Sequence, residues 1–104
     1  MIDLRVGRIV RAERHEKARK PSYKLWIDFG DSQGLGIRQS SAQLTHLYQL
    51  DDLIGKLVVE GINLGERNIA GFLSQVLVLG VPDDAGRVIL LTTERPIPLG
   101  GRVF

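Results

Sequence analysis

An alternating segment in the first third of the chain reads Tyr23-Lys24-Leu25-Trp26-Ile27-Asp28-Phe29. Its odd-numbered positions are apolar or aromatic and its even-numbered positions are polar apart from Trp26, which is the pattern of a half-buried strand. Residues 30–34 follow as a glycine-flanked turn, and residues 35–39 are predicted to return as a third strand. The segment therefore predicts a β-hairpin with one apolar face.

Further short strands are predicted on both sides of this hairpin. Residues 3–11 alternate around Gly7, where a bend or bulge is expected. The same reading places strands at residues 56–62, 75–79 and 87–92. Residues 63–74 are predicted to be a long, irregular connection.

One helix is predicted, after the third strand. Ser40 and Gln43 have the spacing of a capping box, and the apolar residues that follow have helical spacing, so the helix is expected at about residues 42–48. Residues 51–55 have the acidic start and glycine end of a single helical turn.

Five or more short strands with one inserted helix predict a small all-β domain. The first choice is a five-stranded, partly closed antiparallel barrel of the oligonucleotide-binding type, spanning residues 1–104 as one domain. An SH3-like barrel or a small sandwich fits the same strand count. With 104 residues the chain buries roughly two thirds of its unfolded surface, so we expect function on the surface of this module.

The charge is unevenly distributed. The chain carries a net charge of +2, yet residues 1–24 hold eight cations and three anions, whereas the remainder holds six cations and nine anions. A domain polarised in this way can concentrate a polyanion on its basic side. There is no cysteine, and the apolar runs are too short to cross a bilayer, so a cytoplasmic protein without membrane insertion is expected.

The sequence gives no positive support for a catalytic site. His15 and His46 lack a second ligand at metal-binding spacing, and Ser40 and Ser41 lack a nearby histidine base. The pairs Asp51-Asp52 and Asp83-Asp84 are interpreted as turn or capping residues. We therefore expect no enzyme activity, no metal and no cofactor.

Residues 14–24 form the most basic stretch of the chain. They are either a solvated loop or a nucleic-acid contact in which Lys and Arg neutralise phosphates and Tyr23 stacks on a base. Trp26 either packs under a loop or lies at an interface. In the connection at 63–74, Arg67 is a candidate binding residue, and Phe72 could equally close one end of the barrel.

Several ungapped blocks then carry a resemblance. The main block is His15-Glu16-Lys17-Ala18-Arg19-Lys20-Pro21-Ser22-Tyr23-Lys24-Leu25-Trp26-Ile27-Asp28-Phe29-Gly30, and shorter ones lie at 39–43, 53–56 and 74–80. They resemble the CsaA family of export-related chaperones, small relatives of the tRNA-binding domains appended to some aminoacyl-tRNA synthetases. The resemblance covers essentially the whole chain.

This resemblance implies an oligonucleotide-binding barrel, a homodimer, tRNA binding, and a chaperone-like role toward unfolded or precursor polypeptides of the secretion machinery. Carried over residue by residue, it gives Lys17, Arg19, Lys20 and Tyr23 as first candidates for RNA contact, and Arg38, Ser40, Asn63, Arg67 and Ser74 as a second group. The family tends to have two prolines before the arginine, whereas here Gly65-Glu66 precede Arg67. That departure loosens the loop and places an anion beside Arg67.

The leading hypothesis is a noncatalytic, dimeric tRNA-binding protein of the CsaA type. The alternative is a polypeptide-binding chaperone whose nucleic-acid affinity is vestigial. A small enzyme is a third, less favoured reading.

Overall fold

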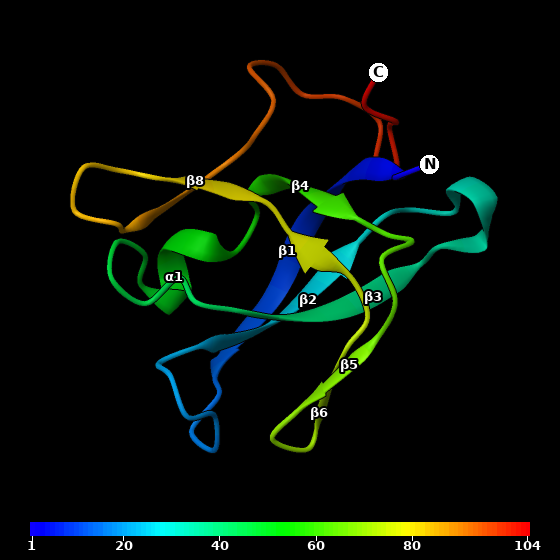
Figure 1. The fold of residues 1–104 in the computed structure, drawn as a ribbon. Coiled ribbons are helices and arrows are strands. Elements are labelled where there is room, and N and C mark those ends of the chain that lie inside the picture. Colours follow the sequence, from blue (N-terminus) through cyan, green and yellow to red (C-terminus); the bar gives the residue numbers. More distant parts are fainter.

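The computed structural model describes the backbone of all 104 residues and every side chain except that of Ser32. Five strands form one antiparallel sheet in the order β3-β2-β1-β4-β7, and the curled sheet is a nearly closed barrel (Figure 1). These strands are β1 (Leu4–Arg14), β2 (Tyr23–Asp28), β3 (Ile37–Ala42), β4 (Leu57–Gly61) and β7 (Leu77–Val78). The expected oligonucleotide-binding fold is confirmed.

Six smaller elements lie between the barrel strands or after the last of them. The two helical ones are η1 (Ser32–Gly34) and α1 (Leu50–Leu53). The others pair as two hairpins, β5 (Arg67–Ile69) with β6 (Phe72–Ser74), and β8 (Gly80–Pro82) with β9 (Val88–Leu90). Residues 63–74 therefore contain a regular hairpin, and the prediction of an irregular connection was wrong.

The long strand β1 organises the barrel because it changes partner along its length. Residues 4–8 pair with β4, and residues 8–14 pair with β2. The register with β2 shifts between Ile9 and Arg11, so the bulge lies beyond the predicted position at Gly7. Gly7 serves close packing instead, since a Cβ there would lie 2.5 Å from Ile27 Cγ2.

The predicted apolar face of β2 lies in the core. Tyr23, Leu25, Ile27 and Phe29 are all buried. The barrel closes where β3 approaches β7, because Gln75 N donates a 2.7 Å hydrogen bond to Gln39 O.

The described residues 42–48 form no helix, although one was expected there, whereas the single helical turn expected at residues 51–55 is present as α1 (Leu50–Leu53). Residues 37–42 are strand β3, with Ser40 paired to Leu25, so the capping-box spacing at Ser40 has no helix to cap. The helix α1 begins after Gln49, whose amide donates to Asp52 Oδ2 at 3.2 Å, and its Leu53 is fully buried. The interpretation of Asp52 as a capping residue is confirmed.

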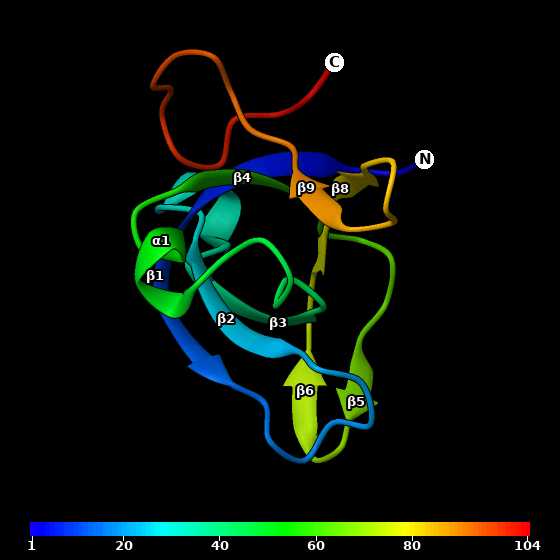
Figure 2. The same ribbon diagram turned by 90° about the vertical axis from the view of Figure 1, so that its left-hand side faces the viewer.

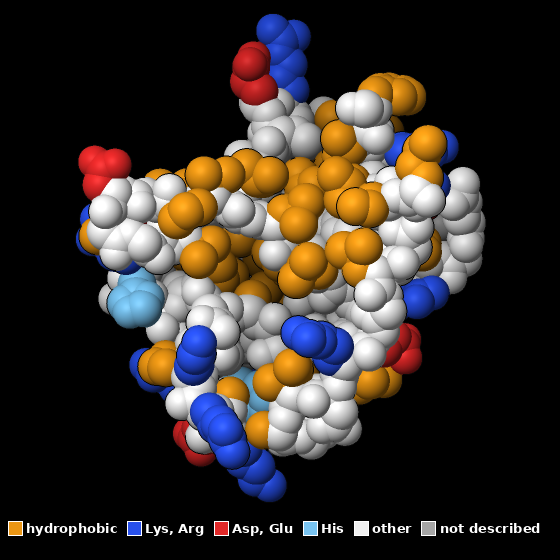
Figure 3. Space-filling model, viewed as in Figure 1, with side chains coloured by type: hydrophobic (Ala, Val, Ile, Leu, Met, Phe, Trp, Pro, Cys, Tyr) orange, Lys and Arg blue, Asp and Glu red, His pale blue; other side chains and the backbone are white. Residues whose placement is uncertain are grey.

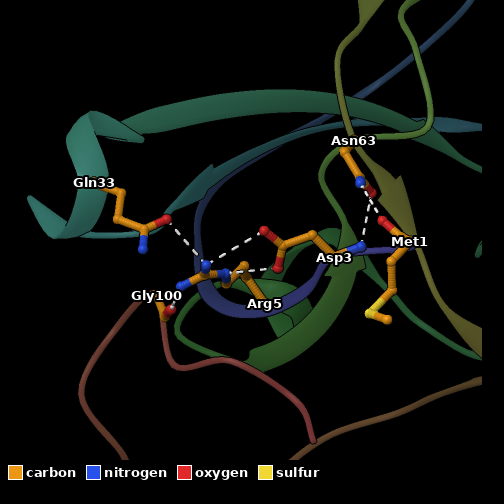
Figure 4. A network of polar contacts seen from close by, with 6 residues as sticks. All are labelled: Met1, Asp3, Arg5, Gln33, Asn63 and Gly100. Carbon is orange, nitrogen blue, oxygen red and sulfur yellow. Dashed lines mark hydrogen bonds and ion pairs between the residues drawn. The ribbon is translucent and has the colours of Figure 1, made fainter.

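The C-terminal segment pairs with the free side of β1 near its start. Val6 N donates to Gly101 O, and Gly100 N donates to Val6 O. Arg5 reinforces this contact, because its guanidinium bonds Asp3 Oδ1 (2.8 Å), Gln33 Oε1 (3.0 Å) and Gly100 O (3.1 Å) (Figure 4). One buried arginine thereby joins three parts of the chain that are distant in sequence.

Candidate nucleic-acid interface

The loop between β1 and β2, residues 15–22, is the first part of the candidate interface, and we call it the basic loop. Its ends are held together because His15 N donates to Ser22 O at 3.0 Å, and Ser22 Oγ donates to Lys20 O at 2.9 Å. Between these points Lys17, Arg19 and Lys20 are exposed. Among the side chains that the structure describes, these three cations form no ion pair.

The β5–β6 hairpin is the second part. Its turn is formed by Ala70 and Gly71, both with positive φ (49° and 88°), as expected for a two-residue hairpin turn. The Asn68 side chain accepts a 2.8 Å hydrogen bond from Gly71 N and fixes this turn. The hairpin is therefore a defined structure that extends from the barrel (Figure 2).

Phe72 docks the hairpin against the basic loop. Its ring meets His15 edge-on at 5.7 Å between centroids and Trp26 at 5.6 Å. The Lys24 ammonium lies 5.3 Å from the Phe72 ring, and the Arg11 guanidinium lies 4.4 Å from the Trp26 ring. Trp26 thus packs against neighbouring side chains, which agrees with the first of the two interpretations, that it packs under a loop.

Cations gather at this end of the molecule. Figure 3 shows Lys and Arg side chains below the apolar region, over the part of the fold that holds the basic loop and the β5–β6 hairpin. Arg67, exposed on β5, adds a cation from the hairpin to those of the loop. Two segments separated by more than forty residues thus form one basic surface.

A pocket of about 300 Å³ lies between the basic loop and the hairpin. Arg14, Lys17 and Lys24 line it with one anion, Glu16. His15 also lines it and is 4% exposed. Its burial depends on Phe72, which a reading of local sequence could not place.

One candidate from each of the two predicted groups, Tyr23 and Ser40, lies in the core. Tyr23 is 4% exposed, and its hydroxyl donates a 2.8 Å hydrogen bond to Tyr48 O. The expectation that Tyr23 stacks on a base is therefore wrong. Ser40 is fully buried in β3, which likewise removes it from a surface contact.

Three other candidates use their polar groups to hold the fold. Arg38 Nε donates to Leu35 O at 2.8 Å. Asn63 accepts from Asp3 N and donates to Met1 O, both at 2.7 Å. Ser74 Oγ accepts from Ser41 N at 3.0 Å. The candidates that the structure brings together at the basic end are Lys17, Arg19, Lys20 and Arg67.

Lys24 and Arg14 were not selected individually from the sequence, although both lie in the basic stretch. Lys24 shares the outer face of β2 with Trp26, so strand alternation was the signal that could have placed it beside the hairpin.

Three carboxyl groups outside the basic end have shifted pKa values. The hydrogen bond from Arg5 lowers the pKa of Asp3, and backbone hydrogen bonds, first that from Arg87, lower the pKa of Asp83. Desolvation raises the pKa of Glu60 to about 9. Asp83 accepts from Ala85 N and Arg87 N, which confirms its turn role.

A second surface feature adjoins the basic end. A groove of about 370 Å³ has an apolar lining that includes Leu44, Ile69, Val78 and Val88, with Arg67 among its polar residues. Figure 3 shows this face hollowed beneath an apolar region over β4 and β8. Leu77 on β7, Val81 on β8 and Ile89 on β9 are exposed apolar side chains.

Among the described residues, no group of three His, Asp or Glu side chains is placed to hold a metal ion. Within that same part of the chain, the helices are too short to span a membrane.

The strand order of the barrel, the helix between its third and fourth strands, and the loops after its first and fourth strands define a class of fold. Such barrels bind oligonucleotides through strands 2 and 3 and through the loops after strands 1 and 4. Here those loops are the basic loop and the connection that carries the β5–β6 hairpin. The fold and the distribution of charge together describe a barrel of the oligonucleotide-binding type with one basic end.

A family model described as "Putative tRNA binding domain" matches residues 4–102, and the chain belongs to this tRNA-binding domain family. Within the family it is CsaA-like. It is similar to the crystal structure of a CsaA chaperone from Picrophilus torridus (43% identity, TM-score 0.90, covering 99% of this chain and 92% of that one). The CsaA structure from Bacillus anthracis is similar to the same degree (44%, TM-score 0.90, 99% and 91%).

Sequence relatives include methionine–tRNA ligases. The ligase of Methanocaldococcus jannaschii is 39% identical over 102 residues, which are 98% of this chain and 15% of that protein. The ligase of Archaeoglobus fulgidus is 37% identical with the same coverage. The chain thus spans about 15% of the length of these relatives.

Proposed function

We propose that this protein is a noncatalytic tRNA-binding module whose contact surface is the basic loop together with the β5–β6 hairpin. The observation that carries the proposal is the state of Lys17, Arg19 and Lys20, which are exposed and have no carboxylate partner among the described side chains. Unpaired cations can neutralise phosphates without first breaking an ion pair. Membership of the tRNA-binding domain family supports tRNA as the nucleic acid.

The test is the salt dependence of tRNA binding, measured by fluorescence anisotropy between about 50 and 300 mM salt. About four phosphate contacts predict a slope of log affinity against log salt near −3.6. The variant Lys17→Glu/Arg19→Glu/Lys20→Glu should flatten the slope by about three units. A variant with two reversals at Arg87 and Arg95, which lie on other segments, is the control. Binding that does not change with salt would refute the proposal.

We propose that two copies form the working unit through the apolar face over β7 and β8. Val81 and Ile89 are cross-strand neighbours there and are both about half exposed. A twofold dimer would bring two basic ends into one particle and so increase tRNA avidity. Light scattering should give a dimer mass, and Val81→Asp/Ile89→Lys should give a monomer. A monomeric wild type would rule this assembly out.

The second candidate function is binding of unfolded or precursor polypeptides for export, as a cytoplasmic chaperone. The apolar groove beside Arg67 favours it, because an extended chain can place alternate side chains in such a lining. The similarity to CsaA chaperone structures supports it.

Suppression of aggregation of an unfolded client tests this second function. We expect Val78→Asp in the groove to abolish suppression, while the triple charge reversal in the basic loop leaves it intact. Equal suppression by wild type and Val78→Asp would contradict the groove as the polypeptide site.

A further inference from the structure

His15 is buried in an unusual setting for a residue beside a basic loop. It is held by its backbone bond to Ser22 and by the edge contact with Phe72. Its Nδ1 atom is buried and has no hydrogen-bond partner among the described residues. Leaving a buried polar atom unpaired costs about 1–3 kcal/mol.

This burial decides which ring nitrogen can serve a ligand. A buried N–H without an acceptor is less tolerable than an unpaired lone pair, so Nε2 is the nitrogen placed to donate. His15 therefore offers one N–H donor to a group in the pocket that it lines.

The pocket has the chemistry of a phosphate site. Arg14, Lys17 and Lys24 line it against Glu16, which leaves an excess of positive charge. Its volume of about 300 Å³ is at the lower end of the range for small-ligand sites, and it is too small for a duplex. The Phe72 ring is buried, and the Lys24 ammonium lies 5.3 Å from its centroid, so it is not available for base stacking. A phosphate fits this lining better than a base does.

We propose that this pocket is a phosphate subsite of the RNA interface, in which His15 donates to an oxygen of a phosphate that Lys17 and Lys24 neutralise. The subsite rests on the proposed function, because it specifies where on the basic end one RNA phosphate is held. It also makes His15 a contact residue, in addition to the exposed lysines and arginines.

Nuclear magnetic resonance of the two histidine rings tests the subsite. On titration with a short RNA that has a 5′-hydroxyl end, and so only internal phosphates, the ring ¹⁵N signals of His15 should shift and saturate. His46, in the exposed turn after β3, is the internal control and should not shift. A parallel titration with inorganic phosphate should move the same His15 signals at concentrations at least about tenfold higher, because one phosphate lacks the other contacts.

The outcomes separate the two proposals. If RNA shifts the amides of the basic loop but leaves the His15 ring unchanged, the subsite is refuted and RNA binding stands. If RNA shifts neither, the proposed function fails. If inorganic phosphate moves His15 and RNA does not, the pocket belongs to a free phosphate ester, and its assignment to RNA is overturned.

Two matched pairs of variants add an affinity measurement. His15→Phe keeps a ring against Phe72 and should weaken RNA binding about three- to tenfold, whereas His46→Phe should leave it unchanged. Lys24→Met should weaken binding about fivefold, and Lys56→Met, beside α1, should not. If His15→Phe does not fold, the lysine pair decides, because equal affinities for Lys24→Met and Lys56→Met would refute the subsite.

Discussion

The two ends of strand β1 hold cations in opposite states. At its C-terminal end the basic loop exposes Lys17, Arg19 and Lys20 without ion pairs among the described side chains. Near its N-terminal end Arg5 is 6% exposed and is bonded to Asp3, Gln33 and Gly100 (Figure 4). A local excess of basic residues in the sequence does not show whether a given cation is exposed or buried. The difference is set by partners: Asp3, together with Gln33 and Gly100 from distant segments, binds Arg5, whereas the described side chains include no ion-pair partner for the loop cations.

The largest effect is expected for Arg5→Met. The substitution leaves the Asp3 carboxylate, the Gln33 amide and the Gly100 carbonyl without their shared donor, so the free energy of unfolding should fall by about 3 kcal/mol. tRNA affinity of the folded variant should match wild type, because Arg5 lies at the opposite end of β1. Urea unfolding and anisotropy measure the two quantities, and a stable variant with weakened binding would reverse the assignment of the two ends.

Glu60 should give the next largest effect, and it depends on pH. It lies opposite Arg5 in the β1–β4 register, is fully buried, and has no hydrogen-bond partner among the described residues. Burial raises its pKa to about 9 in the folded state from an ordinary 4.5. The unfolded state therefore loses its proton first, and the stability contributed by the protonated carboxyl is complete below pH 4.5 and declines as the pH rises toward 9.

Glu60→Gln should remove this decline. Relative to wild type, the variant should gain about 2 kcal/mol of unfolding free energy at pH 8 and almost nothing at pH 4.5. Urea denaturation at the two pH values gives the comparison. A gain that is the same at both pH values would show that Glu60 is ionised in the folded protein.

A smaller effect is expected for one exposed cation of the basic loop. Lys17→Ala should weaken tRNA binding about fivefold and reduce the salt slope by about one unit, because one phosphate contact is lost. Its melting temperature should stay within about 2 °C of wild type. Lys56→Ala is the matched control, and an equal loss of affinity in both variants would indicate nonspecific attraction.

The smallest effect is expected for Arg87→Ala. Arg87 pairs with Asp83 at 2.8 Å in an exposed turn, and exposed pairs contribute little. The melting temperature should change by no more than a few degrees, and tRNA binding should not change. A loss of binding here would extend the interface beyond the basic end.

Strand alternation predicted the barrel strands because one face of a strand such as β2 is buried. The alternation of apolar and polar residues in the sequence follows from that burial. The helix predicted at residues 42–48 was wrong because the spacing of Ser40 and Gln43 fits a capping box, whereas Ser40 is paired with Leu25 across two strands. The turn predicted at residues 51–55 was correct, since it is α1. The β5–β6 hairpin was missed because its strands have three residues each, too few for a periodic pattern.

The parts of the site that could be predicted are those that depend only on residues close together in the sequence. The cations of the basic loop are exposed, which agrees both with a solvated loop and with a nucleic-acid contact, so their role in RNA binding stays a prediction. Tyr23 was misjudged because its hydroxyl bond to Tyr48 O depends on a segment 25 residues away. The burial of His15 likewise depends on Phe72 from β6.

The central claim is that the unpaired cations at the end of β1 form the RNA-binding surface. Backbone amide signals recorded during a tRNA titration test it most directly. We expect shifts or broadening in the basic loop and the β5–β6 hairpin, with the signals of Arg5, Arg87 and Arg102 unchanged. Perturbations centred on the Arg5 end, with the basic loop silent, would contradict the account.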